Sequence, residues 1–114
     1  MATISEIVNG DGKPVALQLA VIDGSSFVCT VWTDWSLLID RRLDQRIPDY
    51  FWPEEGFFLR EASVRLPETG SQVLSSAAIK DDVGIVVGVD FRVGEHFVTV
   101  RSIGGELTIA IRWA

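Results

Sequence analysis

GIVVGVDFRVGEHFVTVRSIGGELTIAIRW, residues 84–113, is the stretch of this chain that decides its fold. Apolar and polar residues alternate along it in three runs, which are separated by the pairs Gly94-Glu95 and Gly104-Gly105. Glycine accepts the positive φ angles that two-residue hairpin turns demand. The stretch therefore predicts a meander of three antiparallel strands, Gly84–Val93, His96–Ile103 and Glu106–Trp113.

Two-residue turns would also fix the register of this meander. The first turn places Phe91 opposite Val98, and the second places Val98 opposite Ile111. Because side chains alternate along a strand, these residues share one apolar face. On the other face we expect a shallow dip at Gly88. The apolar face comprises Val89, Phe91, Val98, Val100, Ile109 and Ile111. The polar face comprises Gly88, Asp90, Thr99, Arg101, Thr108 and Ala110, with Phe97 forming cation–π contacts between Arg92 and Arg112.

The first third of the chain repeats this pattern of short strands and turns. Thr3–Val8, Pro14–Ile22 and Phe27–Thr33 are apolar segments separated by turn signals rich in Gly, Asp and Asn. The second and third segments predict a hairpin with a loop of two or four residues, which pairs Val28 with Leu19 or with Val21. Either length places the same residues on the apolar face. They are Val15, Leu17, Leu19, Val21, Val28, Thr30 and Trp32.

The middle of the chain is harder to assign. Asp34 could cap a short helix, but Leu37-Leu38-Ile39 could equally extend the preceding strand, and the pattern does not decide between them. Pro48 and Pro53 bracket a constrained loop, because the residue before a proline is disfavoured in a helix. Two further elements are expected, a strand over Phe57–Leu66 and either a short helix or an irregular strand over Ser71–Lys80.

Together these elements predict an all-β fold with at most one or two short helices. Six to eight mainly antiparallel strands would form a small antiparallel barrel or a two-layer sandwich. At 114 residues the chain should be a single domain, residues 1–114, that is large enough to bury a core. The expected core comprises Leu17, Leu19, Trp32, Phe91, Val98, Val100, Ile109 and Ile111.

The composition argues against several classes of partner. Ten basic residues face sixteen acidic ones, a net charge of −6, so we expect no nucleic-acid partner. No apolar run approaches the roughly 18–20 residues of a membrane helix. The first residues lack a basic region and a long apolar stretch, so we expect no signal peptide, and with no long apolar run we expect no membrane association. The single cysteine, Cys29, cannot form an internal disulfide, which favours a reducing compartment such as the cytoplasm.

The residue types that carry catalysis are sparse and scattered. His96 is the only histidine, and the predicted register puts its nearest acid, Asp90, on the opposite face of the sheet. Cys29 has no histidine in plausible reach to activate its thiol. One histidine and one cysteine make a poor metal site, and no glycine-rich phosphate loop is present. We therefore expect no cofactor, no metal and no enzymatic activity.

The segment 40–61 is the best candidate for a functional surface. It combines acids, aromatic rings and arginines, which is the composition of interface centres. Long loops in compact domains are often functional. The alternative is a plug, in which the rings fold back and close the open end of the barrel or sandwich. The two coexist if only some rings are buried. The expected partner-binding residues are Asp40, Asp44, Asp49, Tyr50, Phe51, Trp52, Glu54 and Glu55.

Three functions fit these observations. The first is a protein-binding module with a basic protein partner, for instance an immunity or inhibitor protein that neutralises a basic toxin, by analogy of charge and size. The second is a small-ligand-binding β-barrel with a mouth lined by Trp32, Trp35, Tyr50 and Trp52. The third is a homo-oligomeric structural protein. The acidity and the lack of a catalytic set favour the first.

Overall fold

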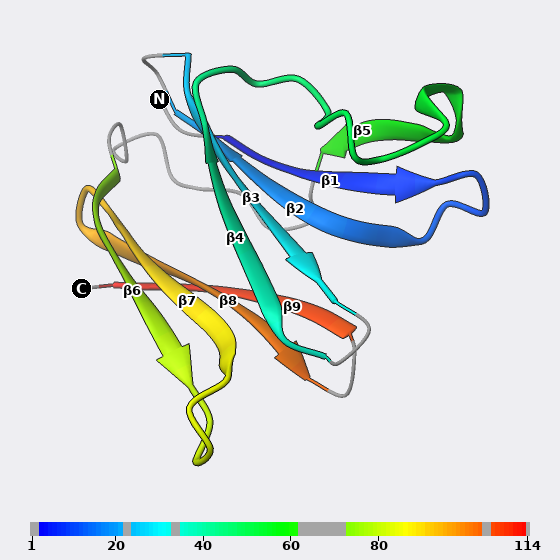
Figure 1. The fold of residues 1–114 in the computed structure, drawn as a ribbon. Helices are drawn as coiled ribbons and strands as arrows, with labels where there is room; N and C mark the ends of the chain where they lie inside the picture. Colours follow the sequence, from blue (N-terminus) through cyan, green and yellow to red (C-terminus); the bar gives the residue numbers. More distant parts are fainter. Residues whose placement is uncertain (1–2, 22–23, 33–34, 62–72, 104–105, 114) are drawn as a thin grey trace.

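Two antiparallel β-sheets, stacked as two layers, make up the structure (Figure 1). The computed structural model describes residues 3–21, 24–32, 35–61, 73–103 and 106–113. Within these ranges the first sheet has the strand order β4-β3-β2-β1-β5 and the second has the order β6-β7-β8-β9. The strands are β1 (Thr3–Asn9), β2 (Pro14–Ala20), β3 (Ser26–Val31), β4 (Leu37–Arg42), β5 (Phe57–Glu61), β6 (Val73–Lys80), β7 (Val86–Val93), β8 (His96–Ile103) and β9 (Glu106–Trp113), with a 3₁₀ turn at Glu54–Gly56.

The C-terminal meander has the predicted register. Phe91 lies opposite Val98 and Val89 opposite Val100, and Val98 and Val100 in turn face Ile111 and Ile109. Gly94 has a φ of 59°, as its place in a two-residue turn requires. The turn at residues 104–105 lies outside the described residues, but the pairing of Ile103 with Glu106 fits it.

The outer face of this meander differs from the prediction at one position. Phe97 lies between two guanidinium groups, 5.5 Å from that of Arg92 and 4.6 Å from that of Arg112, as expected. Gly88, however, is buried, and a Cβ atom there would lie 3.0 Å from the Arg101 side chain and 3.3 Å from that of Ile79. The predicted dip at Gly88 is therefore filled by its cross-strand neighbours.

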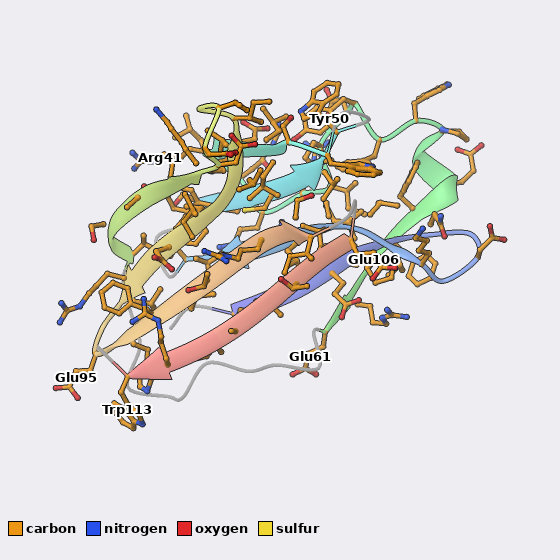
Figure 2. All side chains as sticks on the ribbon, turned by 90° about the horizontal axis from the view of Figure 1, so that it is seen from below. Arg41, Tyr50, Glu61, Glu95, Glu106 and Trp113 are labelled. Carbon is orange, nitrogen blue, oxygen red and sulfur yellow. The ribbon has the colours of Figure 1, made fainter. Side chains whose placement is uncertain are left out.

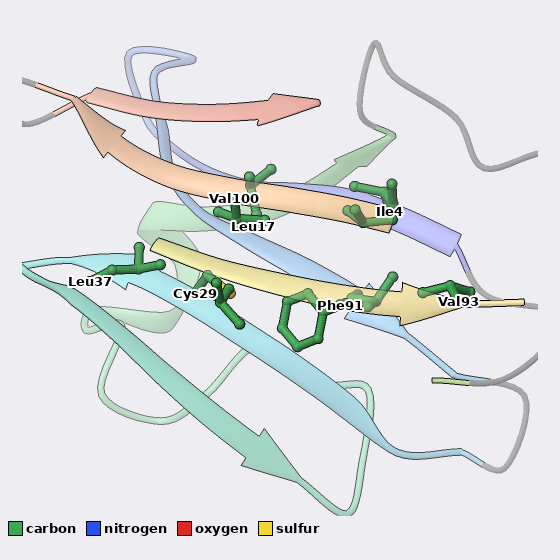
Figure 3. Close-up of a cluster of buried hydrophobic side chains, with 10 residues drawn as sticks. Ile4, Leu17, Cys29, Leu37, Phe91, Val93 and Val100 are labelled. Atoms are coloured by element: carbon green, nitrogen blue, oxygen red, sulfur yellow. The ribbon is translucent and has the colours of Figure 1, made fainter. Parts of the chain in front are cut away.

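The main core lies between the two sheets and takes side chains from both (Figure 3). Phe91 and Val93 of β7 are fully buried there, and the Phe91 ring lies 4.9 Å from that of Phe27 in β3. This shared core makes the fold a two-layer sandwich. Its buried members are Ile4, Leu17, Leu19, Cys29, Leu37, Val89, Phe91, Val93, Val98 and Val100, with Ile109 and Ile111 partly buried against them.

The register predicted for the β2–β3 hairpin is wrong by one residue. Val28 pairs with Gln18, and Leu19 pairs with Phe27. The Val21 amide donates to the Ser25 carbonyl at 2.9 Å, which closes a three-residue loop. An odd loop length reverses the faces of β3 relative to both predicted alternatives.

The reversal changes which side chains enter the core. Cys29 faces the other sheet together with Leu17, while Val28 is buried on the opposite face of its own sheet. Trp32, predicted to be a core residue, is 54% exposed. The expectation for Trp32 is therefore wrong, and Phe27 occupies the core instead.

The ambiguous middle segments are strands. Residues 37–42 form β4 as a hairpin return antiparallel to β3, so both the helix and the simple strand extension are wrong. Residues 73–80 form β6, whose register shifts twice along β7, so the irregular-strand alternative is correct there. The strand predicted over Phe57–Leu66 is present as β5 up to Glu61, and its remainder lies outside the described residues.

Candidate functional site

The loop of residues 43–56, which we call the crossing loop, links the two edges of the five-stranded sheet. It leaves β4 at one edge and enters β5 at the other, so it must span four strand spacings, about 19 Å. β4 is antiparallel to β3, β5 is antiparallel to β1, and both β3 and β1 are antiparallel to β2. β4 and β5 therefore run in the same direction, so the loop must also return along the length of the strands. The loop is long because it crosses the outer face of this sheet (Figure 1).

One aromatic ring attaches the crossing loop to the sheet beneath. Phe51 is 9% exposed and packs in a second apolar cluster with Ile7, Ala16 and Val28. Its ring lies 5.3 Å from that of Phe57. Val28 reaches this cluster because of the reversed face of β3. Phe51 therefore folds back against the chain's own core, as the plug interpretation predicts, but the ring covers the outer face of a sheet and does not close an open end.

Polar contacts hold the same loop to the sheet. The side-chain amide of Gln18 is buried and donates to the Gln45 carbonyl at 2.9 Å. The Gln45 side chain donates to the Val21 carbonyl at 2.7 Å, and the buried Ser26 hydroxyl donates to the Asp44 carbonyl at 2.5 Å. Buried polar groups need hydrogen-bond partners. These hydrogen bonds therefore stabilise the loop, and the loop carbonyls provide partners for the buried side chains of Gln18 and Ser26.

The residues next to Phe51 point the other way. Trp52 is 79% exposed and Tyr50 is 50% exposed, so the burial of the ring changes at each step along Tyr50-Phe51-Trp52. Asp49 and Glu55 are also exposed. Glu54 begins the 3₁₀ turn, and its side chain lies outside the described part of the structure.

Asp40, Arg42, Asp44 and Tyr50 form a polar cluster at the β4 side of the loop. Arg42 lies 3.1 Å from Asp40 and 3.6 Å from Asp44, and the Tyr50 hydroxyl donates to Asp40 at 2.8 Å. Burial and the hydrogen bond to Asp40 raise the pKa of Tyr50 to about 12. Arg42 neutralises part of the negative charge of the two acids. Among the predicted site residues whose side chains the structure describes, Asp49 and Glu55 are the acids outside this cluster.

An open groove of about 1050 Å³ lies beside the exposed rings. It combines an apolar floor with charged side chains of both signs, and both the crossing loop and β5 contribute to it. Its lining comprises Gln45, Arg46, Ile47, Pro48, Asp49, Phe51, Trp52, Glu55, Phe57 and Leu59.

The structure thus brings together most of the predicted site. Seven of its residues have described side chains: Phe51 is an anchor, Asp40, Asp44 and Tyr50 are in the polar cluster, and Asp49, Trp52 and Glu55 line the groove. Sequence reasoning did not identify the roles of Gln18 and Ser26. A polar side chain at a strand position that faces a covered surface is the signal that could have found them.

The four aromatic residues predicted to line one barrel mouth are separated. Trp32 and Trp35 line a groove at one end of the sandwich, whereas Trp52 lies in the groove of the crossing loop and Tyr50 beside Asp40. Between the sheets the described residues leave a cavity of about 10 Å³, about enough for one water molecule. This cavity between the sheets has no room for a larger ligand.

The histidine, its nearest acid and the cysteine lie apart. His96 is buried opposite Val93 and stacks at 4.1 Å on Trp113. Asp90 faces outward, where it accepts a hydrogen bond from Thr99. Burial raises the pKa of the Cys29 thiol to about 12, which keeps it protonated and unreactive at neutral pH. Among the described residues, no group of three or more His, Cys, Asp or Glu side chains could hold a metal ion.

Comparisons with known proteins leave the chain without an assigned relative. No protein-family model, no curated protein and no solved structure matches it. In the described residues, no helix has the length and apolar character needed to span a membrane. The function must therefore be inferred from the surface itself.

Proposed function

We propose that this chain is a non-enzymatic protein-binding module that recognises a basic protein through the crossing loop and its groove. The observation that carries the proposal is the division of the loop into an anchored and an exposed half. Phe51 and the backbone at residues 44 and 45 are fixed to the sheet, while Tyr50 and Trp52 are exposed. A surface fixed before binding loses little conformational entropy when a partner docks.

The exposed tryptophans support a binding surface. Trp32, Trp35, Trp52 and Trp113 are each more than half exposed. Tryptophan is usually among the more buried residues, and exposed rings are enriched at the centres of interfaces. Trp52 is the most exposed of the four, and it lines the groove of the crossing loop.

Charge supports a basic partner. The net charge is −6, and in the groove beside Trp52 the acids Asp49 and Glu55 outnumber the basic residue Arg46. A positively charged side chain of the partner would meet both carboxylates, and its approach would be accelerated by the field of the whole molecule. A small acidic protein with a fixed aromatic and acidic surface is suited to neutralise a basic toxin or nuclease, and we propose this role as the specific form of the function. The unreactive thiol of Cys29 is compatible with a reducing compartment such as the cytoplasm.

The test is capture of a partner followed by measurement of its affinity for designed variants. The immobilised protein is expected to retain a basic protein from an extract of its native host, and the affinity should fall as salt is added. The double variant Asp49→Asn/Glu55→Gln removes two charges from the groove. It should slow association and weaken binding about tenfold or more.

A matched control removes the same charge elsewhere. Asp82→Asn/Glu95→Gln changes two exposed acids outside the crossing loop, so both double variants have the same net charge. The control should bind as tightly as the unchanged protein. Equal losses in both double variants would show that only net charge matters and would contradict the assignment to this surface.

A further inference from the structure

A second groove lies at one end of the sandwich, where the two sheets meet. Its volume is about 550 Å³, within the range of small-ligand sites. The beginning of β2, the end of β3, the β3–β4 turn and the beginning of β9 all contribute to it. Its lining comprises Lys13, Pro14, Val15, Val31, Trp32, Trp35, Glu106 and Leu107. None of these residues belongs to the groove of the crossing loop.

The floor of this end groove is apolar and its tryptophans are exposed. Val31 and Leu107 are partly buried against the main core. Trp32 and Trp35 are 54% and 61% exposed. Glu106 is the first residue of β9 and Trp113 is the last (Figure 2). The groove therefore lies at the end of β9 away from Trp113 and from its neighbour, the buried His96. Rings that are more than half exposed contribute less to folding than buried rings do, because they bury less area.

The β3–β4 turn that carries Trp35 has the same hydrogen bonds as three other turns of the chain. Each of the four turns spans five residues. The amide of the first residue donates to the carbonyl of the fifth, and the amide of the fourth donates to the carbonyl of the first, at 2.9–3.1 Å. The fourth residue then adopts a positive φ. It is Gly12 (77°), Gly24 (91°) and Gly84 (88°) in three turns, but Trp35 (67°) in the fourth.

Tryptophan is the wrong residue for this position by local physics alone. A bulky side chain at positive φ is strained, whereas glycine is not. The Trp35 side chain does not offset this strain by burial, since it is mostly exposed. Residues held in strained conformations cluster at binding and active sites. The strain and the groove are independent observations, and both assign a binding role to Trp35.

The charged side chains of the groove select the class of ligand. Lys13 donates hydrogen bonds and Glu106 accepts them, so together they suit hydroxyl groups, which do both. An anion would be repelled by Glu106 and a cation by Lys13. A proline-rich peptide offers mostly acceptors and would leave Glu106 without a donor. We propose that the end groove binds a neutral oligosaccharide, with the C–H face of a sugar ring stacked on the Trp35 or Trp32 indole.

A neutral glycan array, followed by calorimetry with its strongest binder, tests this proposal. We expect at least one neutral oligosaccharide to bind and to change the tryptophan fluorescence. Trp35→Gly should lower the affinity about tenfold or more. Because this variant places glycine where the other three turns have it, its unfolding midpoint should rise, so the lost binding cannot be attributed to a damaged fold.

Trp52→Ala is the matched control, because Trp52 is exposed in the other groove. It should leave oligosaccharide affinity unchanged, and Trp32→Ala and Glu106→Gln should each lower it. Three results would overturn the proposal: an array without any neutral binder at millimolar concentration, unchanged affinity in Trp35→Gly, or binding of a decaproline peptide with no oligosaccharide bound. None of these results bears on capture of a basic protein by the crossing loop.

Discussion

The C-terminal meander and the crossing loop differ in what determines their side-chain directions. In the meander, each residue faces the core or the solvent according to its place in a two-residue period, and neighbouring strands are joined by short turns. In the crossing loop, Phe51 is buried while Trp52, the next residue, is 79% exposed. The direction of the loop residues is decided by Ile7, Ala16 and Val28, which are distant in sequence.

This difference separates scaffold from surface. In a strand, side chains alternate between the two faces of the sheet, so every second position is committed to the core. A loop that is attached at a few points can present its remaining residues to a partner. We therefore assign stability to the meander and recognition of the basic partner to the loop, and the two can be perturbed separately.

The largest effect on stability is expected at the centre of the meander. Phe91 is fully buried between the sheets, and Phe91→Ala should lower the free energy of unfolding by about 3–5 kcal/mol. Urea unfolding measures the loss. Phe97→Ala is the control, since Phe97 is a phenylalanine on the outer face of the same sheet and should cost about 1 kcal/mol. Similar losses for both rings would contradict the assignment of faces.

A smaller effect is expected where the crossing loop is anchored. Phe51→Ala removes the ring from the second apolar cluster and should lower the free energy of unfolding by about 2–3 kcal/mol. Trp52→Ala, one residue later, should change it by about 0.5 kcal/mol or less. The same urea titration compares them. If Trp52→Ala were the more destabilising of the two, the division of the loop into anchored and exposed halves would be wrong.

A stabilising change is expected in the β3–β4 turn. Trp35→Gly should raise the free energy of unfolding by about 1 kcal/mol, because it relieves a strained positive φ. Gly24→Ala is the reciprocal control: beyond the chain neighbours of Gly24, no described residue has an atom within 4 Å of the added Cβ, so the cost of about 1 kcal/mol would come from the backbone. Thermal unfolding of both variants should shift in opposite directions, and a destabilised Trp35→Gly would show that the indole is needed for folding.

The smallest effect concerns Tyr50, the single tyrosine of the chain. Its pKa is raised from 10.0 to about 12 in the folded protein, first by burial and second by the hydrogen bond to Asp40. Because this pKa is higher in the folded than in the unfolded state, the contribution of Tyr50 to the free energy of unfolding is complete below pH 10 and is lost as the pH rises toward 12. The absorbance of tyrosinate should therefore appear near pH 12 in the folded state and near pH 10 in urea.

Asp40→Asn separates the two causes of this shift. Because burial is the larger cause, the variant should lower the pKa of Tyr50 only part of the way toward 10.0. An ordinary pKa in the unchanged folded protein would show that Tyr50 is not held against Asp40, and that this side of the crossing loop is loosely attached.

The meander could be predicted from the sequence because its contacts are local. Two turn assignments were enough to pair Phe91 with Val98 and Val98 with Ile111, and both pairings are confirmed. The β2–β3 hairpin could not be predicted because its loop has three residues, whereas the turn signal suits loops of two or four, and a shift of one residue reverses the faces of a strand. A dip is predicted at Gly88 because the sequence pattern does not indicate where the side chains of Arg101 and Ile79 lie.

The candidate surface was predicted by composition, but its internal division was not. Acids and rings in residues 40–61 predict an interface, whereas burial of Phe51 depends on which face of β3 carries Val28. The hydrogen bonds from Gln18 to the Gln45 carbonyl and from Ser26 to the Asp44 carbonyl likewise depend on the loop crossing this sheet. The end groove was missed as a unit because its residues come from four separate parts of the chain.

The central claim is that recognition of a basic partner belongs to the crossing loop and not to the meander. Trp52 and Trp113 allow the most direct comparison, because both are exposed tryptophans, 79% and 69%, one in each region. The decisive measurement is the affinity of the captured partner for Trp52→Ala and for Trp113→Ala. We predict a loss of about tenfold or more for Trp52→Ala and unchanged affinity for Trp113→Ala. Weaker binding by Trp113→Ala, with full affinity in Trp52→Ala, would contradict the claim.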